Sequence, residues 1–379
     1  MLSSVLLDAC LKAGIDFFTG VPDSFLSGLC DELFARWGTD GPRHTVAHNE
    51  GGAIGLCAGH YLSTGRPALC YMQNSGLGNT VNPLTSLMDS RVYALPCLLV
   101  IGWRGEPGVR DEPQHVRQGA ITLAQLELLD IPYFILSPDT EDQAFLDRFS
   151  ALLSHLREGR VAAIVVRKGA LKASGKPDYG NSFVMTRERA AGILLKAMGP
   201  TDAVVSTTGK LSREIFELRE KAGLGHEKDF LTVGSMGHAS MIALQIARNC
   251  PDRRVWCLDG DGAALMHLGA LPVIGQAAPG NLIHVVIDNG AHETVGGMPV
   301  CSGRLPLRAL ASAAGYPAVL SADSEASLSA ALQALPKGVA GPVFLAVSCA
   351  CGARADLGRP TTTPIQNRDA FMNFLKQSS

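Results

Sequence analysis

Two short stretches decide the fold: Gly260-Asp261-Gly262, which follows the apolar run Val255 to Leu258, and Asp288-Asn289, which follows Leu282 to Ile287. Each polar group comes directly after a run typical of a buried parallel strand, and open α/β sheets bind ligands at that edge. The segment between the two stretches is long enough for one crossover helix. We therefore expect Asp261 and Asn289 to reach one point from adjacent strand ends.

The donors at this point favour a small, hard cation. A carboxylate, an amide oxygen and a nearby backbone carbonyl suit an octahedral cation that also holds phosphate oxygens and water. Gly260 and Gly262 allow backbone amides to approach phosphate at the start of the next helix. The pattern therefore predicts a site for magnesium and a diphosphate.

Composition excludes several classes of protein. A formal charge of −2 and a pI near 6.5 argue against a nucleic-acid surface. The N-terminal residues 1–8 are not typical of a secretory signal, and no apolar run approaches the roughly 20 residues of a membrane span. Ten cysteines lie mostly in apolar stretches without zinc spacing, which favours core thiols in a reducing cytoplasm. A redox or metal role for the close pair Cys349 and Cys351 is the less favoured alternative.

Apolar runs alternate with amphipathic helical stretches through the chain, which predicts an α/β protein with doubly wound parallel sheets. Six expected strands precede a Gly- and Pro-containing polar stretch without periodicity, and six follow it. We expect two similar domains, residues 1–168 and 186–379, joined by a linker at 169–185, although no literal sequence repeat is present. Residues 366–379 are expected to form a short helix docked on the body or at an interface.

Polar groups in the first domain also follow expected strands. Glu50 opens a Gly/Ala-rich helix after the second strand, where it either lines a pocket or serves as a helix N-terminal acid. Asp23 follows the first strand, and two interpretations of it, a helix cap and an active-site group, are equally favoured. Gln73 to Asn79, after the third strand, is expected to be a loop whose backbone approaches a ligand.

The stretch Gly102 to His115 contains two arginines, three acids and two prolines with no period, so we expect a loop. Its acids, Glu106, Asp111 and Glu112, fit a solvated surface. Arg104 and Arg110 are suited to binding a dianion, and His115 to titrating near neutrality.

In the second domain, Ser206 to Gly209 follows a strand and can present hydroxyls, amides and the neighbouring Lys210 to phosphate. Met236 lies in Gly234-Ser235-Met236-Gly237-His238 at the end of the next strand. By itself it is best explained as an ordinary core methionine.

These segments together resemble the thiamine-diphosphate-dependent 2-oxoacid decarboxylases along nearly the whole chain. The family signature pairs Gly-Asp-Gly with Asn-Asn, and its metal ligand is the second Asn, so Asp288 in place of the first leaves Asn289 as ligand. The resemblance implies the thiamine-diphosphate-binding fold, with the pyrimidine-binding domain first, the diphosphate-binding domain second, and no middle domain.

The resemblance also implies residue roles. Glu50 would hydrogen-bond the aminopyrimidine ring and promote loss of the thiazolium C2 proton, Met236 would wedge the two rings into a V shape, and the Gly234 carbonyl would accept from the aminopyrimidine. The metal ligands would be Asp261, Asn289 and the Ala291 carbonyl. The cofactor-binding set is Glu50, Gln73, Gly209, Gly234, Met236, Gly260, Asp261, Gly262, Ala263, Asn289 and Ala291.

The loop Arg104 to His115 is similar to that of family members acting on 2-oxoacids with a phosphonate or sulfonate group. This implies decarboxylation of 3-phosphonopyruvate to phosphonoacetaldehyde and carbon dioxide in phosphonate, and so antibiotic, biosynthesis; sulfopyruvate or another small 2-oxoacid is the alternative. The expected catalytic residues are Glu50, His115 and Asp23. The expected substrate residues are Arg104, Arg110, Lys210 and Ser24.

The family usually builds each active site between subunits, so the resemblance implies a homodimer or larger assembly. A nicotinamide-dependent dehydrogenase would need a Gly-x-Gly-x-x-Gly turn after an early strand, and none is present. A non-catalytic, cofactor-binding regulatory relative is disfavoured because Glu50 is intact.

Overall fold

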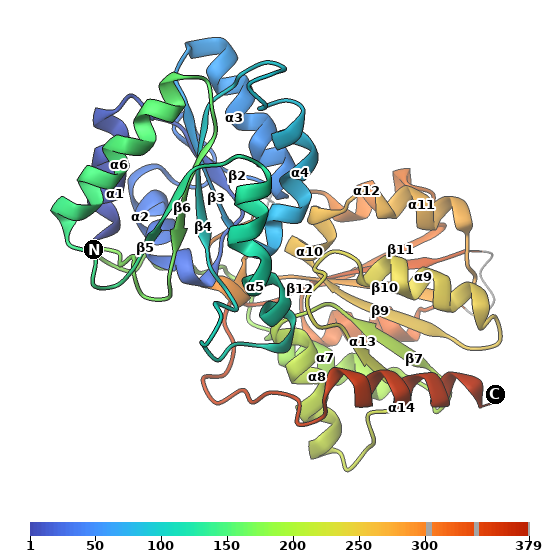
Figure 1. The fold of residues 1–379 in the computed structure, drawn as a ribbon. Coiled ribbons are helices and arrows are strands. Elements are labelled where there is room, and N and C mark those ends of the chain that lie inside the picture. The colour runs from blue at the N-terminus through green and yellow to red at the C-terminus, as the bar shows by residue number, and fades with distance from the viewer. Residues whose placement is uncertain (301–304, 337–340, 378–379) are drawn as a thin grey trace. The chain divides into compact units, whose positions relative to one another are not determined.

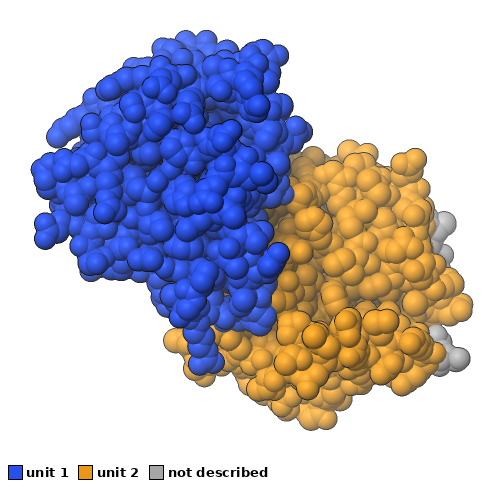
Figure 2. Space-filling model, in the orientation of Figure 1, with its two compact units in different colours: residues 1–178 blue, residues 179–379 orange. Residues whose placement is uncertain are grey.

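The computed structural model describes residues 1–300, 305–336 and 341–377. The chain divides into two compact units, residues 1–178 and 179–379, shown in blue and orange in Figure 2. Each unit contains one six-stranded sheet built from described residues, with helices on its faces (Figure 1). Within the described ranges, no helix is both long enough and apolar enough to cross a membrane.

The first unit begins with a helix and then alternates strands with helices. Its strands are β1 (Phe18–Gly20), β2 (His44–Val46), β3 (Ala68–Gln73), β4 (Cys97–Gly102), β5 (Tyr133–Leu136) and β6 (Ala162–Val166). Its helices are α1 (Ser3–Lys12), η1 (Ser24–Leu26), α2 (Ser27–Trp37), α3 (Glu50–Thr64), η2 (Asn74–Gly76), α4 (Leu77–Thr85), α5 (Pro113–Leu128) and α6 (Asp142–Arg157).

The second unit is built in the same way. Its strands are β7 (Ala203–Ser206), β8 (Asp229–Leu231), β9 (Val255–Gly260), β10 (Leu282–Asp288), β11 (Ala318–Ala322) and β12 (Val343–Ser348). Its helices are α7 (Arg187–Ala197), α8 (Lys210–Lys221), α9 (Ala239–Asn249), α10 (Asp261–Met266), α11 (Ala270–Ala277), η3 (Glu293–Val295), α12 (Leu307–Ala313), α13 (Glu325–Gln333) and α14 (Pro364–Lys376).

The two sheets share one topology. The strand order is β2-β1-β3-β4-β6-β5 in the first unit and, read in the matching direction, β8-β7-β9-β10-β12-β11 in the second. Every strand pair in the described parts of the chain is parallel. Thus β7 corresponds to β1, β9 to β3 and β10 to β4. The predicted pair of doubly wound domains is confirmed, and the repeat absent from the sequence is present in the topology.

The strands are apolar on both faces because helices cover both sides of each sheet. In β9, Val255 and Cys257 pack with α9, α11 and α12, whereas the alternating residues Trp256 and Leu258 pack with α7, α8 and α13.

The C-terminal helix α14 begins at a capping box formed by Thr363. Its Phe371 and Phe374 are buried near β7 and β8, as expected for a docked helix.

Two stretches expected to be loops are partly helical. Helix α5 begins at Pro113, a favourable first helical residue, so His115 lies in its first turn. After β3, residues 74–76 form η2 and α4 follows directly, which places Asn79 on a helix. The nine cysteines in the described ranges are free thiols, mostly buried, in agreement with a core role; Cys301 lies outside those ranges.

Candidate functional site

The predicted residues gather at the carboxyl ends of the strands in each unit. In both sheets the winding reverses between corresponding neighbours, β1 and β3 in the first unit and β7 and β9 in the second. Doubly wound sheets bind ligands at such a reversal because the connections diverge there and leave a crevice. In each unit, the candidate residues therefore lie where a doubly wound sheet would bind a ligand.

In the first unit, Asp23 and Gln73 meet at the reversal. Gln73 Nε2 donates a hydrogen bond of 2.5 Å to Asp23 Oδ1, and the Phe25 backbone N–H donates one of 3.0 Å to Oδ2. Asp23 is fully buried and caps η1, so it is both a cap and a member of this polar cluster. Burial raises the pKa of the Asp23 carboxyl, although the hydrogen bonds and the charge of Arg104 oppose this.

Glu50 is the first residue of α3 and is 4% exposed. Its Oε2 accepts a hydrogen bond of 2.7 Å from Asn79 Nδ2 on α4. Gly76 lies against the same carboxylate so closely that a Cβ atom there would overlap it. A helix N-terminal acid is normally solvated, so the burial and the single side-chain partner indicate more than a dipole effect.

An ion pair within the charged loop after β4 holds Arg104 in place. Asp111 accepts from Arg104 Nε at 2.8 Å and from Nη2 at 2.5 Å, and also from the backbone N–H groups of Gly105 and Glu112. Arg104 Nη1 donates to Ser24 Oγ at 3.0 Å. Arg110 is exposed and forms no ion pair with any residue that the structure describes.

The prediction that the loop's acids are solvated is wrong for two of them. The side chain of Asp111 is 8% exposed and that of Glu106, paired with Arg167 at 2.6 Å, is 16% exposed. Burial opposes ionisation of Asp111, but its hydrogen bonds from Arg104 and the backbone hold its pKa well below the usual range. An acid in a loop with few apolar residues is predicted from the sequence to be solvated, because the hydrogen-bond donors that allow its burial are visible only in the tertiary structure.

The expected titration of His115 near neutrality is also wrong. His115 is 8% exposed, and burial together with the charge of Arg104 lowers its pKa to about 4. Its Nδ1 is buried and has no hydrogen-bond partner among the described residues. The imidazole is therefore neutral at pH 7.

In the second unit, the metal-ligating candidates lie at the ends of β9 and β10, which pair in parallel with Gly260 opposite Ile287. Asp261 Oδ2 accepts from the Gly290 backbone N–H at 2.9 Å, which ties the two strand ends together. Asp261, Asn289 and Ala291 are 4%, 6% and 7% exposed. Their carboxylate, amide and carbonyl oxygens form the donor set of a small hard cation.

The turn after β8 has an unusual backbone. Gly234, Ser235 and Gly237 all have positive φ angles, of 71°, 45° and 87°, and such a conformation costs free energy at a non-glycine residue. Thr208 Oγ1 accepts from the Gly234 N–H at 3.0 Å and holds the turn beside the end of β7. Met236 is partly exposed, so the core explanation for this methionine does not hold.

Gly209 and Lys210 begin α8 beside this turn. Gly209 has a φ of 104°, and a Cβ atom there would lie 2.7 Å from Thr294 Oγ1, so both conformation and space require glycine. Lys210 Nζ lies 3.1 Å from Glu293 Oε1, and Glu293 Oε2 accepts a hydrogen bond of 3.3 Å from Asn289 Nδ2. The lysine charge is therefore already paired, next to the proposed metal ligand.

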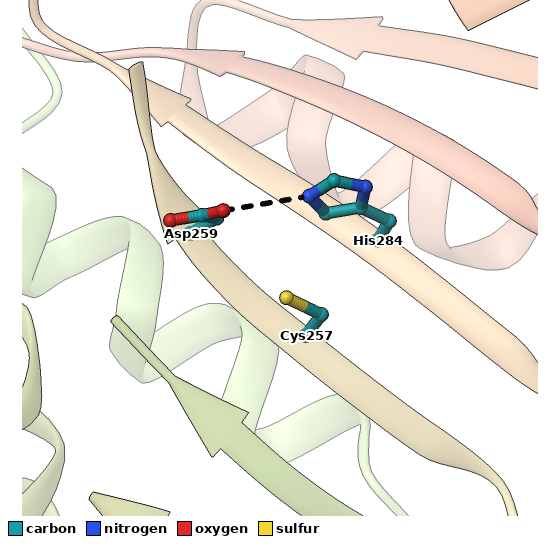
Figure 3. Close-up of side chains that lie close together, drawn as sticks. All are labelled: Cys257, Asp259 and His284. Atoms are coloured by element: carbon teal, nitrogen blue, oxygen red, sulfur yellow. Dashed lines mark ion pairs between the residues drawn. The ribbon is translucent and has the colours of Figure 1, made fainter. Parts of the chain in front are cut away.

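A further polar cluster lies on β9 and β10, just before Gly260-Asp261-Gly262 and Asp288-Asn289 in the chain (Figure 3). Cys257, Asp259 and His284 offer ligand atoms within 4.8 Å of one another, the one such trio in the described parts of the chain. His284 Nε2 is 3.8 Å from Asp259 Oδ2, its Nδ1 is 3.1 Å from the Tyr316 hydroxyl, and Asp259 Oδ1 accepts from the Gly260 N–H. A structural zinc site needs four ligands. We therefore interpret the trio as a buried structural cluster, in which Asp259 holds the Gly260 N–H while Asp259 Oδ2 and His284 Nε2 have no hydrogen-bond partner among the described residues.

The structure thus brings Asp23, Ser24, Gln73 and Arg104 together in the first unit, and Asp261, Asn289 and Lys210 together in the second. Sequence reasoning missed three partners of these residues: Asp111, Asn79 and Glu293. Asn79 was expected in a loop, and pairing of Asp111 with Arg104 follows no helical or strand period. Each partner is defined only by tertiary contacts.

Comparisons with known proteins agree with this architecture. Residues 1–128 match the N-terminal TPP binding domain of thiamine pyrophosphate enzymes, and residues 208–347 match the C-terminal TPP binding domain. Residues 129–207 lie between the matched regions, and the structure divides them between the two units, so no middle domain is present.

Whole-length relatives include two phosphonopyruvate decarboxylases. The one from Streptomyces viridochromogenes is 37% identical over 96% of this chain and 92% of its own length. The one from Streptomyces hygroscopicus is 35% identical over 98% of this chain and 93% of its own length. A sulfopyruvate decarboxylase from Methanosarcina acetivorans is 29% identical over 82% of this chain and 81% of its own length. The chain therefore belongs to the thiamine pyrophosphate enzymes, in the group formed by the phosphonopyruvate and sulfopyruvate decarboxylases.

Proposed function

We propose that this protein decarboxylates 3-phosphonopyruvate to phosphonoacetaldehyde and carbon dioxide, with thiamine diphosphate and magnesium, as a step of phosphonate and antibiotic biosynthesis. The observation that carries the substrate is the whole-length similarity to phosphonopyruvate decarboxylases, at 37% and 35% identity. Sulfopyruvate is the second candidate because a sulfopyruvate decarboxylase matches at 29% identity over a smaller share of the chain.

The residues present fit the cofactor. Asp261, Asn289 and the Ala291 carbonyl offer hard oxygens for magnesium. Gly209 and Gly260 directly precede α8 and α10, whose first backbone N–H groups can approach a diphosphate. When bound, thiamine diphosphate supplies a thiazolium that accepts the electron pair released as carbon dioxide leaves.

In the first unit, Glu50 is proposed to hold a proton near the aminopyrimidine. Its buried carboxylate has one side-chain partner, Asn79, on Oε2, and Gly76 keeps the space beside Oε1 free of a side chain. A carboxylate in this environment interacts strongly with a donor nitrogen because few other dipoles screen it.

Asp23 is the better candidate than His115 for supplying a proton after carbon dioxide leaves. The lowered pKa of His115, about 4, leaves the imidazole without an extra proton at pH 7. Asp23 is fully buried, burial raises the pKa of its carboxyl towards the range of a general acid, and Gln73 and η1 fix its position. We retain His115 as a neutral hydrogen-bonding group beside Arg104.

The anionic group of the substrate is proposed to meet Arg104 and Ser24, with Arg110 approaching from the exposed part of the loop. Lys210 is the weaker substrate candidate because Glu293 pairs with it and its ammonium, unlike the planar guanidinium of Arg104, has no fixed set of remaining donors.

We also propose a homodimer or larger assembly with the active site between subunits, in which α3 forms part of the interface. Gly55 and Gly59 on this helix have open space beside them, and Leu56 and Leu62 are 39% and 71% exposed, which suits an apolar contact with a partner subunit. Glu50 is the first residue of the same helix.

A substrate panel tests the proposal. Purified protein with magnesium and thiamine diphosphate is incubated with phosphonopyruvate, sulfopyruvate and pyruvate, and the aldehyde is measured by coupled reduction. The expected result is the highest kcat/KM for phosphonopyruvate. A higher value for sulfopyruvate would reassign the substrate, and release of aldehyde from none of the three would refute the decarboxylase activity.

A further inference from the structure

The buried acid of the charged loop has a saturated set of hydrogen bonds. Asp111 Oδ2 accepts from Arg104 Nε (2.8 Å) and the Gly105 N–H (2.9 Å), while Oδ1 accepts from Arg104 Nη2 (2.5 Å) and the Glu112 N–H (2.8 Å). Two parallel bonds from one guanidinium fix its plane as well as its position. Two backbone N–H groups in turn fix the carboxylate.

Arg104 is also held from the opposite side. Its Nη1 donates to Ser24 Oγ at 3.0 Å, and the guanidinium carbon lies 4.8 Å from the centre of the Phe25 ring. Ser24 adjoins Asp23, so the guanidinium is placed beside the buried Asp23–Gln73 pair at the ends of β1 and β3. An arginine has five N–H donors. Asp111 and Ser24 take three of them, and no other described residue accepts from the side chain.

Charge alone does not explain this arrangement. Asp111 neutralises Arg104, which weakens a long-range attraction for an anion. The same bonds hold the remaining donors and the Ser24 hydroxyl in fixed directions, so that less side-chain freedom is lost when an anion binds. This fixed geometry offsets the weaker long-range attraction, because a planar guanidinium in a fixed position can match two oxygens of a tetrahedral group.

We propose that Asp111 is a positioning residue for substrate specificity: it holds Arg104 so that its remaining donors, with Ser24, bind the tetrahedral oxyanion at C3 of a 2-oxoacid. The inference rests on the proposed function for its substrate class. A phosphonate and a sulfonate share this chemistry, and the test includes both.

The variant Asp111→Asn keeps the shape of the side chain and removes the charge and one acceptor. Glu106→Gln is the matched control, because Glu106 is a largely buried acid of the same loop that pairs with Arg167 instead. Kinetics on phosphonopyruvate, sulfopyruvate and pyruvate are measured for both variants and the wild type. We expect Asp111→Asn to raise KM for the oxyanion substrates at least tenfold with kcat changed less than threefold. For pyruvate, kcat/KM changes less than threefold, and Glu106→Gln leaves all three substrates unaffected.

A binding measurement separates this inference from the proposed function. Methylphosphonate is titrated with the cofactor-loaded protein and followed by the width of its ³¹P resonance. We expect broadening with the wild type and Glu106→Gln, and at least tenfold weaker binding with Asp111→Asn. Absence of binding to the wild type, or equal binding to Asp111→Asn, overturns the inference even if phosphonopyruvate is turned over. If no oxyanion substrate is turned over but binding depends on Asp111, the proposed function fails and the inference stands.

A double-mutant cycle and a second variant guard against a purely structural effect. In an Arg104→Lys background, Asp111→Asn adds less than a threefold loss, because lysine cannot form the paired bonds. Additive losses would contradict positioning through Arg104. If Asp111→Asn fails to fold, Ser24→Ala removes only the hydroxyl on the other side of Arg104, and an unchanged KM for both oxyanion substrates would then overturn the proposal.

Discussion

Gly76 lies directly against the carboxylate of Glu50, and a Cβ atom on Gly76 would overlap it. The backbone of Gly76, with φ −75° and ψ −15°, is one that alanine adopts readily. Space, not conformation, therefore requires glycine here. Gly78, two residues further along, has no atom within 4 Å of its corresponding Cβ position.

This difference gives a matched pair of substitutions. Gly76→Ala displaces Glu50 and is expected to lower kcat at least tenfold, whereas Gly78→Ala keeps full activity and raises helix stability by about 0.5 to 1 kcal/mol. Steady-state kinetics and thermal unfolding of both variants check this. Full activity of Gly76→Ala would show that the position of Glu50 is unimportant.

Glu50→Gln tests the chemistry of the same residue. The amide retains the size of the side chain but cannot stabilise a protonated pyrimidine nitrogen, so activity should fall by about two to four orders of magnitude. Cofactor binding, measured by calorimetry, should persist. Near wild-type turnover would exclude Glu50 from the reaction.

The metal site is tested by two acids at neighbouring strand ends. Asp261→Ala removes a charged ligand and should abolish retention of magnesium and thiamine diphosphate. Asp288→Asn restores the residue that the family signature carries, and should bind both as the wild type does. Calorimetric titration distinguishes the two. Unchanged binding by Asp261→Ala would remove the central assignment.

Arg110 tests whether the loop closes over substrate. If the loop stays as described, exposed Arg110 contributes about 0.2 to 1 kcal/mol to phosphonopyruvate specificity. If the loop closes as a lid, Arg110→Ala and Arg104→Ala should each cost roughly 2 to 4 kcal/mol, the scale for one partner of a desolvated charge pair. We expect the larger loss in kcat/KM for phosphonopyruvate and almost no change in kcat/KM for pyruvate. Both values are measured for each variant. Arg117→Ala, an exposed arginine on α5, is the control. An equal loss of kcat/KM for both acids would mean that the arginines hold the loop in place and do not bind the phosphonate group.

His115 should make stability depend on pH. Its pKa is about 4 in the folded protein, from burial and the charge of Arg104, against roughly 6.5 when unfolded. As pH falls from 6.5 to 4, the unfolded chain takes up a proton that the folded chain does not. The folded state is therefore destabilised, by at most about 3 kcal/mol. Urea unfolding of His115→Gln should show a smaller slope, because burial also lowers the pKa values of His44 and His292 to about 4 and their contributions remain. His238→Gln, at an exposed histidine, should retain the wild-type slope, and equal slopes in wild type and His115→Gln would contradict the burial argument.

The periodicity of the chain was sufficient to predict the sheets. Runs such as Val255 to Leu258 are short, rich in strand-forming residues and apolar at every position, which is typical of a parallel strand covered on both faces. Polar residues directly after these runs, such as Asp261 and Asn289, had to lie at the carboxyl edge. The sequence therefore determined the fold class, and with the family resemblance it determined the cofactor and the candidate residues at each strand end.

The partners of those residues depended on the tertiary structure. Asp111 pairs with Arg104 within a loop, whereas Asn79 pairs with Glu50 and Gln73 with Asp23 between separate elements, so no helical or strand period sets these contacts. The same is true of the lowered pKa of His115, because burial is a property of the packed unit. Sequence patterns record which side chains face a sheet or a helix, since those follow from local geometry. Which polar atoms meet at the strand ends is decided only when the loops are placed in three dimensions.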